Sequence, residues 1–531
     1  MRFCYSGYRP VLTLLVVLLV APTAVADIEL PKLFSDHMVL QQHQTMRING
    51  SADANEALAV SFNGQVVEAV ADKNGNWSAI IRTGPAGGPY QLEVASRDSQ
   101  TKVVFNDVLV GEVWICSGQS NMLFPVDNSK LAQQSIEAAK DYPTIRGFNV
   151  APTASVQPLK DFANVDSWFC CAADSIKDFS AIAYLFGREL NRKLDVPIGL
   201  ILVAAERTTL ESWTPYDTLK QDGSFDQLLM HWEERGEPTN QNRVSNSFNA
   251  MVAPLSGFGF RGVIWCHGEA NLGRGAQYGR ILPLMIQSWR KKLGQHECPF
   301  LFVQPTPFRY TERPVEGLPE IWDAQLKTFM SMPGTGMVVT TDLADEQSNQ
   351  PANKLPVAQR LSKWAFSGCY KQMLAKKMKS PDVGAPIPAL VDQNGDEKSN
   401  KTERSDGAAD KTLISLEVPA KLVASGPIFE SAEIDGNKIV INFSQIGSAL
   451  RLDPTTEHGF TICGEDREFV PAEAMLKGQQ MIIYHPEISA PIAVRYGWTD
   501  TAKPTLKNSS GLPASSFRTD EFPLLSDGVE F

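Results

Sequence analysis

Short apolar runs alternate with helix-like segments through the middle of the chain, and this alternation restricts the fold more than any other feature. The apolar runs are 108–116, 198–205, 262–266 and 300–303, and the helix-like segments include 181–194 and 280–293. An apolar run without polar alternation is typical of a strand buried on both faces. Such strands, when separated by helices, form a parallel sheet with helices on both sides. We therefore expect an α/β domain over residues 107–375.

Two regions of a different texture flank this domain. In 27–106, short alternating stretches are joined by Asn63-Gly64 and Asn74-Gly75, and Asn-Gly favours the tight turns of β-hairpins. The same texture returns in 416–531. Residues 391–411 are rich in charges and poor in apolar side chains, so we expect a flexible linker or a surface insertion at 376–415. The expected plan is an N-terminal β module, an α/β domain, a linker and a C-terminal β region.

The first 26 residues have the features of an export signal. Met1-Arg2 precedes an apolar run at 11–20, and Ala24-Val25-Ala26 supplies small residues where a signal peptidase cleaves. The run is shorter than the roughly 20 apolar residues that cross a bilayer, so we expect cleavage rather than a membrane anchor. The mature protein is then expected to be secreted or periplasmic, without a membrane span.

Charge and cysteine content argue against several classes of function. The net charge is -11 at pH 7, and so acidic a chain repels nucleic acid backbones and anionic membranes. Eight cysteines are present, and 8 − 1 = 7 remain once Cys4 leaves with the signal, so at least one thiol should be free. No Cys-x-x-Cys pair occurs, which argues against a zinc ribbon or a dithiol redox site. The adjacent Cys170 and Cys171 are expected to pack, or to pair with other cysteines.

The densest chemical signal is GEVWICSGQSNM at 111–122, where an apolar strand runs into Gly118, Gln119 and Ser120. A serine that follows a buried strand and a small residue, and that precedes a helix, has its hydroxyl lifted out of the sheet. Backbone N–H groups then face any developing oxyanion. Taken alone, Gly-Gln-Ser is equally consistent with a polar turn.

Longer segments favour the first interpretation. The blocks LPKLFSDHMVLQQ at 30–42, DVLVGEVWICSGQSNM at 107–122 and GLPASSFRTD at 511–520 resemble the sialate O-acetylesterase family of the SGNH hydrolase superfamily, as do 86–94, 179–190, 196–201 and 493–498. The resemblance implies an SGNH/flavodoxin-like three-layer catalytic domain with flanking all-β modules. It also implies an esterase that removes O-acetyl groups from sialic acids or related sugars, with Ser120 as nucleophile and without a metal or cofactor. The expected partner is an acetylated carbohydrate or glycan.

The same resemblance identifies a departure at the family's acid and base. Family members carry Asp-x-His-Pro-x-Asn-Lys, in which the histidine takes the serine proton and the aspartate orients it. Here the segment at 348–354 reads SNQPANK, so Ser348 and Gln350 occupy the acid and base positions. A glutamine amide does not accept a proton near pH 7, so Gln350 holds a hydroxyl in place without activating it.

Two further departures concern the groups around the oxyanion. The family's Trp-Gly-Gly-Thr turn is AERT at 205–208, where a carboxylate repels an oxyanion unless Arg207 offsets its charge; an ion-paired surface Glu206 and Arg207 is the alternative. The family's Trp-x-Gln-Gly-Glu-x-Asn is WCHGEAN at 265–271, so His267 stands where the glutamine would be. We assign oxyanion or substrate contacts to Gln119, Glu206, Arg207, Glu269 and Asn271.

Two hypotheses follow. In the first, Ser120 and His267 form a nucleophile with a relocated base, and Glu269 or another carboxylate orients the histidine. In the second, His267 only replaces a hydrogen-bonding glutamine beside a disused serine, and the protein is a glycan-binding pseudoenzyme. The changes at Ser348, at Gln350 and at the Glu206-Arg207 pair separate the two hypotheses, because a fold does not by itself establish an activity.

Overall fold

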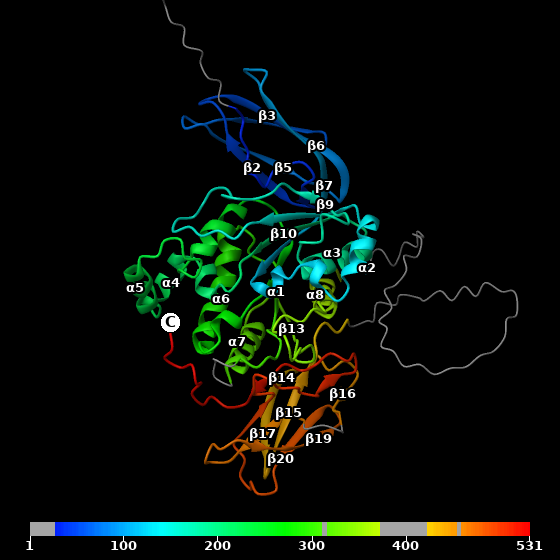
Figure 1. Ribbon diagram of the computed structural model, residues 1–531, viewed down its shortest axis with the longest axis vertical. Helices are drawn as coiled ribbons and strands as arrows, with labels where there is room; N and C mark the ends of the chain where they lie inside the picture. Colours follow the sequence, from blue (N-terminus) through cyan, green and yellow to red (C-terminus); the bar gives the residue numbers. More distant parts are fainter. Residues whose placement is uncertain (1–26, 311–315, 372–421, 454–457, 531) are drawn as a thin grey trace, which may run out of the picture.

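The computed structural model describes residues 27–310, 316–371, 422–453 and 458–530. The expected signal at 1–26 and the expected linker at 376–415 lie outside these residues. Three regions follow one another along the long axis in Figure 1: a β module at the N-terminal end, a central α/β domain and a C-terminal β region. None of the described helices combines the length and the apolar character that crossing a bilayer requires.

The central domain contains the predicted parallel sheet. Its strands are β7 (Lys102–Gly118), β8 (Ile145–Val150), β9 (Phe169–Cys170), β10 (Ile198–Ala204), β11 (Gly262–Cys266), β12 (Phe300–Val303) and β13 (Thr335–Val338). They lie in the order β13-β12-β11-β7-β10-β8-β9, and every neighbouring pair is parallel except β8 and β9. Each apolar run of the sequence falls on one of these strands, so the expected fold class is confirmed.

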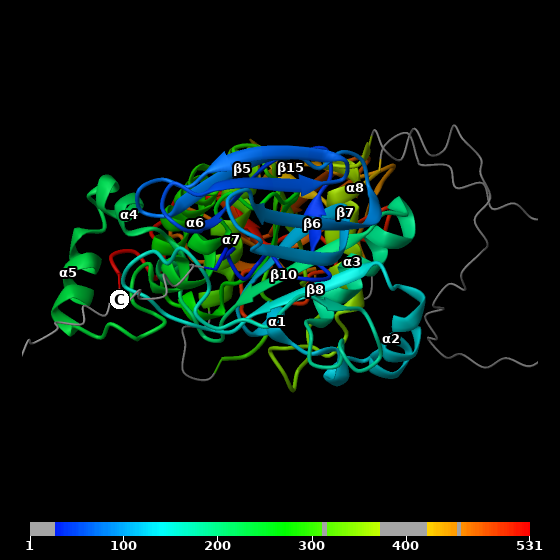
Figure 2. The same cartoon turned by 90° about the horizontal axis from the view of Figure 1, so that it is seen from above.

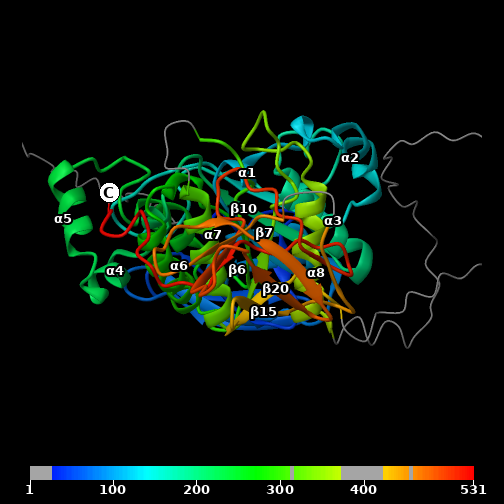
Figure 3. The ribbon, with the colours of Figure 1, turned by 90° about the horizontal axis from the view of Figure 1, so that it is seen from below.

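Helices cover both faces of this sheet and complete three layers. They are α3 (Ala181–Leu194) and α8 (Leu355–Gly368) on one face, and α6 (Gly275–Lys292) and α7 (Gly317–Ser331) on the other. Figures 2 and 3 show α3 and α8 on the side of the molecule opposite α6. Shorter helices are α1 (Ser120–Leu123), α2 (Ala132–Ala138), α4 (Tyr216–Asp222) and α5 (Asp226–Arg235).

The side chains of β7 explain why both faces need cover. Trp114 and Cys116 pack with α3 and α8, whereas Val113 and Ile115 pack with α6 and α7, and all four are fully buried. The helix expected at 181–194 is α3. It begins at Ala181 because Ser180 caps it: the Ser180 hydroxyl accepts the Ala183 N–H at 3.1 Å. The helix expected at 280–293 begins five residues earlier than expected, at Gly275.

The N-terminal module is continuous with this sheet. Its strands are β1 (Val39–Gln41), β2 (Thr45–Ser51), β3 (Ala57–Phe62), β4 (Gln65–Val70), β5 (Asn76–Arg82) and β6 (Gly87–Ser96). The Asn63-Gly64 turn between β3 and β4 has positive φ at both residues, as a tight hairpin requires. β6 pairs with the first part of β7, so the domain boundary proposed at 106/107 falls inside a single strand.

The C-terminal region consists of short antiparallel strands. They are β14 (Ile428–Asp435), β15 (Lys438–Ser444), β16 (Leu450–Arg451), β17 (Phe460–Cys463), β18 (Val470–Pro471), β19 (Glu473–Lys477), β20 (Gln480–Tyr484), β21 (Ala493–Tyr496), β22 (Lys507–Asn508) and β23 (Phe517–Arg518). This region is attached to α7: Arg518 lies 3.5 Å from Asp323, and the Asp500 carboxylate accepts the Leu318 N–H at 2.8 Å.

The strand order reverses at β7. After β7 the chain builds β8 and β10 on one side, and then crosses to build β11, β12 and β13 on the other. In open α/β sheets, ligands bind outside the carboxyl ends of the strands at such a reversal. The loops after β7, β10 and β11 meet there, and these loops contain most of the residues singled out in the sequence.

Candidate active site

Ser120 follows β7 in a turn that requires glycine. Gly118 has φ +126°, and a Cβ there would lie 2.1 Å from the Cys266 carbonyl oxygen. The Gln119 N–H donates to that oxygen at 2.9 Å, and the Ala205 N–H donates to the Gly118 carbonyl at 3.1 Å. The turn is thereby held by β11 on one side and by the segment leaving β10 on the other. Ser120 is partly exposed, and its hydroxyl makes no hydrogen bond within the described part of the chain.

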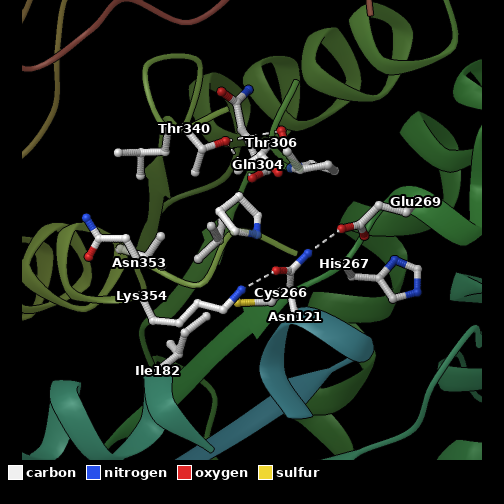
Figure 4. A pocket seen from close by; sticks show the side chains of 15 residues that line it. Asn121, Ile182, Cys266, His267, Glu269, Gln304, Thr306, Thr340, Asn353 and Lys354 are labelled. Carbon is white, nitrogen blue, oxygen red and sulfur yellow. Dashed lines mark hydrogen bonds between the residues drawn. The ribbon is translucent and has the colours of Figure 1, made fainter. Parts of the chain in front are cut away.

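The side chains on either side of Ser120 hold one carboxylate. Gln119 Nε2 donates to one oxygen of Glu269, and Asn121 Nδ2 donates to the other at 2.9 Å. The amide oxygen of Asn121 accepts from the Lys354 ammonium at 2.6 Å, so Asn121 lies between a cation and an anion, as Figure 4 shows. Glu269 is therefore placed to fix the conformation of the turn that presents Ser120.

Burial shifts both charged groups of this network toward neutrality. It lowers the pKa of Lys354 to about 8, although the nearby Cys266 thiol and Glu269 favour the ammonium form. Burial also raises the pKa of Glu269, against the opposing hydrogen bonds from Asn121 and Gln119. Because the charged forms lose hydration here, each depends on Asn121 for a polar partner.

His267 is buried, with 2% of its surface exposed, and makes no hydrogen bond to Ser120. Its Nε2 lies 2.9 Å from the carbonyl oxygen of Thr208, so Nε2 carries the proton and donates it, while Nδ1 has no partner among the described residues. Its ring is stacked between Trp265 at 5.0 Å and Tyr278 at 5.9 Å. Burial lowers the pKa of His267 to about 3, which keeps the imidazole neutral but makes it a weak base.

The loop that carries Ser348 and Gln350 does reach the nucleophile turn. The Asn349 carbonyl accepts from Asn121 Nδ2 at 3.1 Å, which places this loop beside the residue that follows Ser120. The Ser348 hydroxyl accepts the Gln350 N–H at 3.0 Å, so Ser348 stabilises a turn of the backbone. The Gln350 side chain is partly exposed and makes no hydrogen bond to a described residue.

The remaining assigned residues divide into exposed and buried groups. Glu206 and Arg207 follow β10, are exposed, and form no ion pair with each other or with another described residue, so the surface ion pair considered from sequence is absent. Arg207 has φ +54°, the left-handed conformation that glycine favours. Asn271 is fully buried: its oxygen accepts the Leu210 N–H at 2.9 Å and its nitrogen donates to Glu211. Its burial gives it a supporting role.

A cavity of about 20 Å³ lies behind the nucleophile turn, with room for about one water molecule. Asn121, Glu269, Thr306 and Lys354 contribute to its lining, and Ser120 does not. Gln119, which is 3% exposed, also faces inward onto Glu269. A sugar is much larger than this space, so a bound substrate would lie on the exposed side of Ser120, near the turn after β10.

Three residues of the site were not singled out from sequence: Asn121, Thr208 and Lys354. Asn121 stands inside the Gly-Gln-Ser-Asn block, and Lys354 served only to set the register of the segment at 348–354. The pairing of Asn121 with Lys354 joins positions 233 residues apart. No local pattern predicts a contact of that kind.

Comparisons with known proteins identify the family of this chain. A family model described as carbohydrate esterase, sialic acid-specific acetylesterase, matches residues 110–366. The mouse sialate O-acetylesterase is 30% identical over 380 residues, which cover 61% of this chain and 68% of the mouse protein. This chain belongs to the sialate O-acetylesterase family. The crystal structure of a carbohydrate acetylesterase from Xanthomonas citri, 30% identical, superimposes with a TM-score of 0.77 and covers 93% of this chain and 100% of that one.

The family model describes a carbohydrate esterase, and the curated relatives share part of their length with this chain. The sialate O-acetylesterase of Pongo abelii is 31% identical over 353 residues, which cover 61% of this chain and 65% of that protein. This chain thus matches just under two thirds of that curated relative. The substrate and the catalytic residues are questions of the site itself.

Proposed function

We propose that this protein is an exported esterase that hydrolyses O-acetyl esters on sialic acid or a related sugar, with Ser120 as nucleophile. The observation that carries the proposal is the position of Ser120. It follows β7 where the strand order reverses, in a turn that admits only glycine at 118, and its hydroxyl makes no hydrogen bond to a described residue. Its family membership supplies the substrate class.

The chemistry proceeds in two steps in this proposal. The Ser120 oxygen attacks the acetyl carbonyl carbon, and the bond from that carbon to the sugar oxygen breaks. The sugar oxygen takes up the proton that the serine lost, and an acetyl-serine remains. Water then attacks the acetyl-serine, releases acetate and restores the hydroxyl. Both steps require a base. In this proposal His267 acts as that base only after its ring moves away from the Thr208 carbonyl, because its Nε2–H faces that oxygen at 2.9 Å.

A second candidate function is glycan binding without turnover. The observation that favours it is the absence, among the described residues, of an imidazole or carboxylate hydrogen-bonded to the Ser120 hydroxyl. Loss of an activated nucleophile costs several orders of magnitude in rate. On this view the exposed Glu206 and Arg207 contact the sugar, and the protein recognises acetylated glycans without hydrolysing them.

Hydrolysis of O-acetylated sialic acid and of an aryl acetate by the full chain tests the first candidate. Slow turnover should be lost in Ser120→Ala and retained in Ser78→Ala, a matched control because Ser78 is exposed on β5. A mass increase of one acetyl group on Ser120 would identify the intermediate. Equal rates in both variants would refute Ser120 as nucleophile. Saturable binding of the sugar without hydrolysis would support the second candidate.

A further inference from the structure

Three potential metal ligands from distant parts of the sequence meet on the surface of the N-terminal half. They are His37, in the turn before β1, Asp107 on β7, and Cys170 on β9, and one ligand atom of each lies within 4.8 Å of the other two. His37 Nδ1 lies 2.7 Å from Asp107 Oδ2. The side chain of His37 is 44% exposed and that of Asp107 is 32% exposed, so an ion can reach them from solvent.

The backbone brings two of these side chains together at a cost. Asp107 lies where the pairing of β6 with β7 shifts register, between Phe105 and Val108, and it has φ +52°. His37 has φ +66°, and its N–H donates to the Asn106 carbonyl at 3.1 Å. A β-bulge re-aims a side chain, and non-glycine residues held in the left-handed region cluster at binding sites. Both features occur here in residues that contact each other.

We propose that His37, Asp107 and Cys170 form a zinc-binding site. An imidazole, a carboxylate and a thiolate are the donors that Zn²⁺ takes in proteins, and three protein ligands leave a fourth position for water. Asp107 and a Cys170 thiolate together balance the charge of the ion. Binding requires the thiol to lose its proton to solvent.

Arg146 is compatible with this site as a partner of the carboxylate. Its Nη2 donates to Asp107 Oδ2 at 2.9 Å, whereas no described residue donates to Oδ1, which leaves Oδ1 for the ion. Arg146 is also the cross-strand neighbour of Cys170. Carboxylates that bind a metal are usually held by such an outer hydrogen bond. Ligand atoms around tetrahedral Zn²⁺ are roughly 3.3–3.8 Å apart for bonds of about 2.0–2.3 Å. His37 Nδ1, which lies 2.7 Å from Asp107 Oδ2, therefore has to give up that hydrogen bond when it binds the ion.

The proposed zinc site is separate from the esterase site. Asp107 and Gly118 lie 11 residues apart on the extended strand β7, which is about 36 Å at about 3.3 Å per residue. A bound ion would connect the N-terminal module, through His37, to β7 and to β9 at the edge of the central sheet. Its expected effect is therefore on stability and not on the chemistry at Ser120.

Zinc binding by tag-free full-length protein, stripped of metal with a chelator, tests the proposal. Titration with Zn²⁺ alone should show one bound ion per chain, with release of about one proton from the thiol at neutral pH. His37→Ala and Cys170→Ser should each weaken binding at least about tenfold, since loss of an outer partner alone has that effect. His43→Ala, an exposed histidine of the same module, should bind as the parent does.

Cobalt provides a second readout. Co²⁺ bound by a thiolate gives a sulfur-to-metal charge-transfer band, which should be present in the parent and in His43→Ala, and absent in Cys170→Ser. Failure to bind Zn²⁺, or equal binding by the parent, His37→Ala and Cys170→Ser, would overturn the proposal and leave a hydrogen bond between His37 and Asp107. Each variant is compared by its thermal unfolding without metal, which shows whether it folds.

Discussion

Restoring the family acid and base should raise esterase activity. The change is Ser348→Asp with Gln350→His. The loop that carries both positions is already attached beside the nucleophile, because the Asn349 carbonyl accepts from Asn121 Nδ2 at 3.1 Å. The Ser348 side chain already contacts the backbone of residue 350 at 3.0 Å. An aspartate there is within reach of a histidine two residues on.

The size of the gain follows from what the structure lacks. A positioned general base contributes about 10²–10⁴-fold in rate. The lower figure is the expectation for the double variant, which corresponds to about 2.7 kcal/mol of barrier. The turn after β10 limits the gain, because Glu206 is exposed next to the site and repels an oxyanion. Adding Glu206→Gly and Arg207→Gly should give a further increase, since Arg207 already has the φ of +54° that glycine favours.

The assay is kcat/KM for an aryl acetate at pH 8, with folding checked by circular dichroism. Gln347→His is the matched control, because it adds an imidazole to the same loop at an exposed position. The gain should disappear when Ser120→Ala is added to the double variant. A well-folded quadruple variant with no gain, or a gain that survives Ser120→Ala, would refute the inference that this loop aims residue 350 at Ser120.

Three further predictions concern stability and pH. Glu112→Ala should lower the free energy of unfolding by about 3 kcal/mol in urea titrations, because the fully buried Glu112 holds Arg261 through two contacts of 2.6 and 2.8 Å. Glu68→Ala, which removes one partner of an exposed ion pair, should lower it far less. Gly118→Ala should lower the melting temperature and abolish any Ser120-dependent turnover, while Gly368→Ala, where an added Cβ meets nothing within 4 Å, should be tolerated. With a pKa of about 3 when folded and about 6.5 when unfolded, His267 takes up its proton only on unfolding at intermediate pH, so stability falls as pH drops. The parent should lose about 2 kcal/mol more than His267→Gln between pH 7 and pH 5, and equal losses would contradict the buried neutral state.

The class of the fold and the tight turn after β7 were predictable because both depend on short segments of the sequence. An apolar run of five residues such as Gly262–Cys266 has one stable environment, the interior of a covered sheet. The turn at Gly118 is local as well, since its glycine and the strand before it are adjacent in sequence. The domain boundary at 106/107 was less predictable. β7 changes from exposed to buried positions along its length without ending, so the composition changes where the strand does not.

The sequence by itself determined which side chains are present and the strands and helices that carry them. Only the tertiary structure decided what they do. His267 occupies a position in the middle of a family motif, yet its ring is stacked between Trp265 and Tyr278 and its proton faces Thr208. The placing of Asn121 between Lys354 and Glu269, and the meeting of His37, Asp107 and Cys170, likewise join segments far apart in the chain. The reason is physical: local patterns report burial and turn geometry, whereas a pKa or a hydrogen bond depends on the atoms that long-range packing brings within a few ångströms.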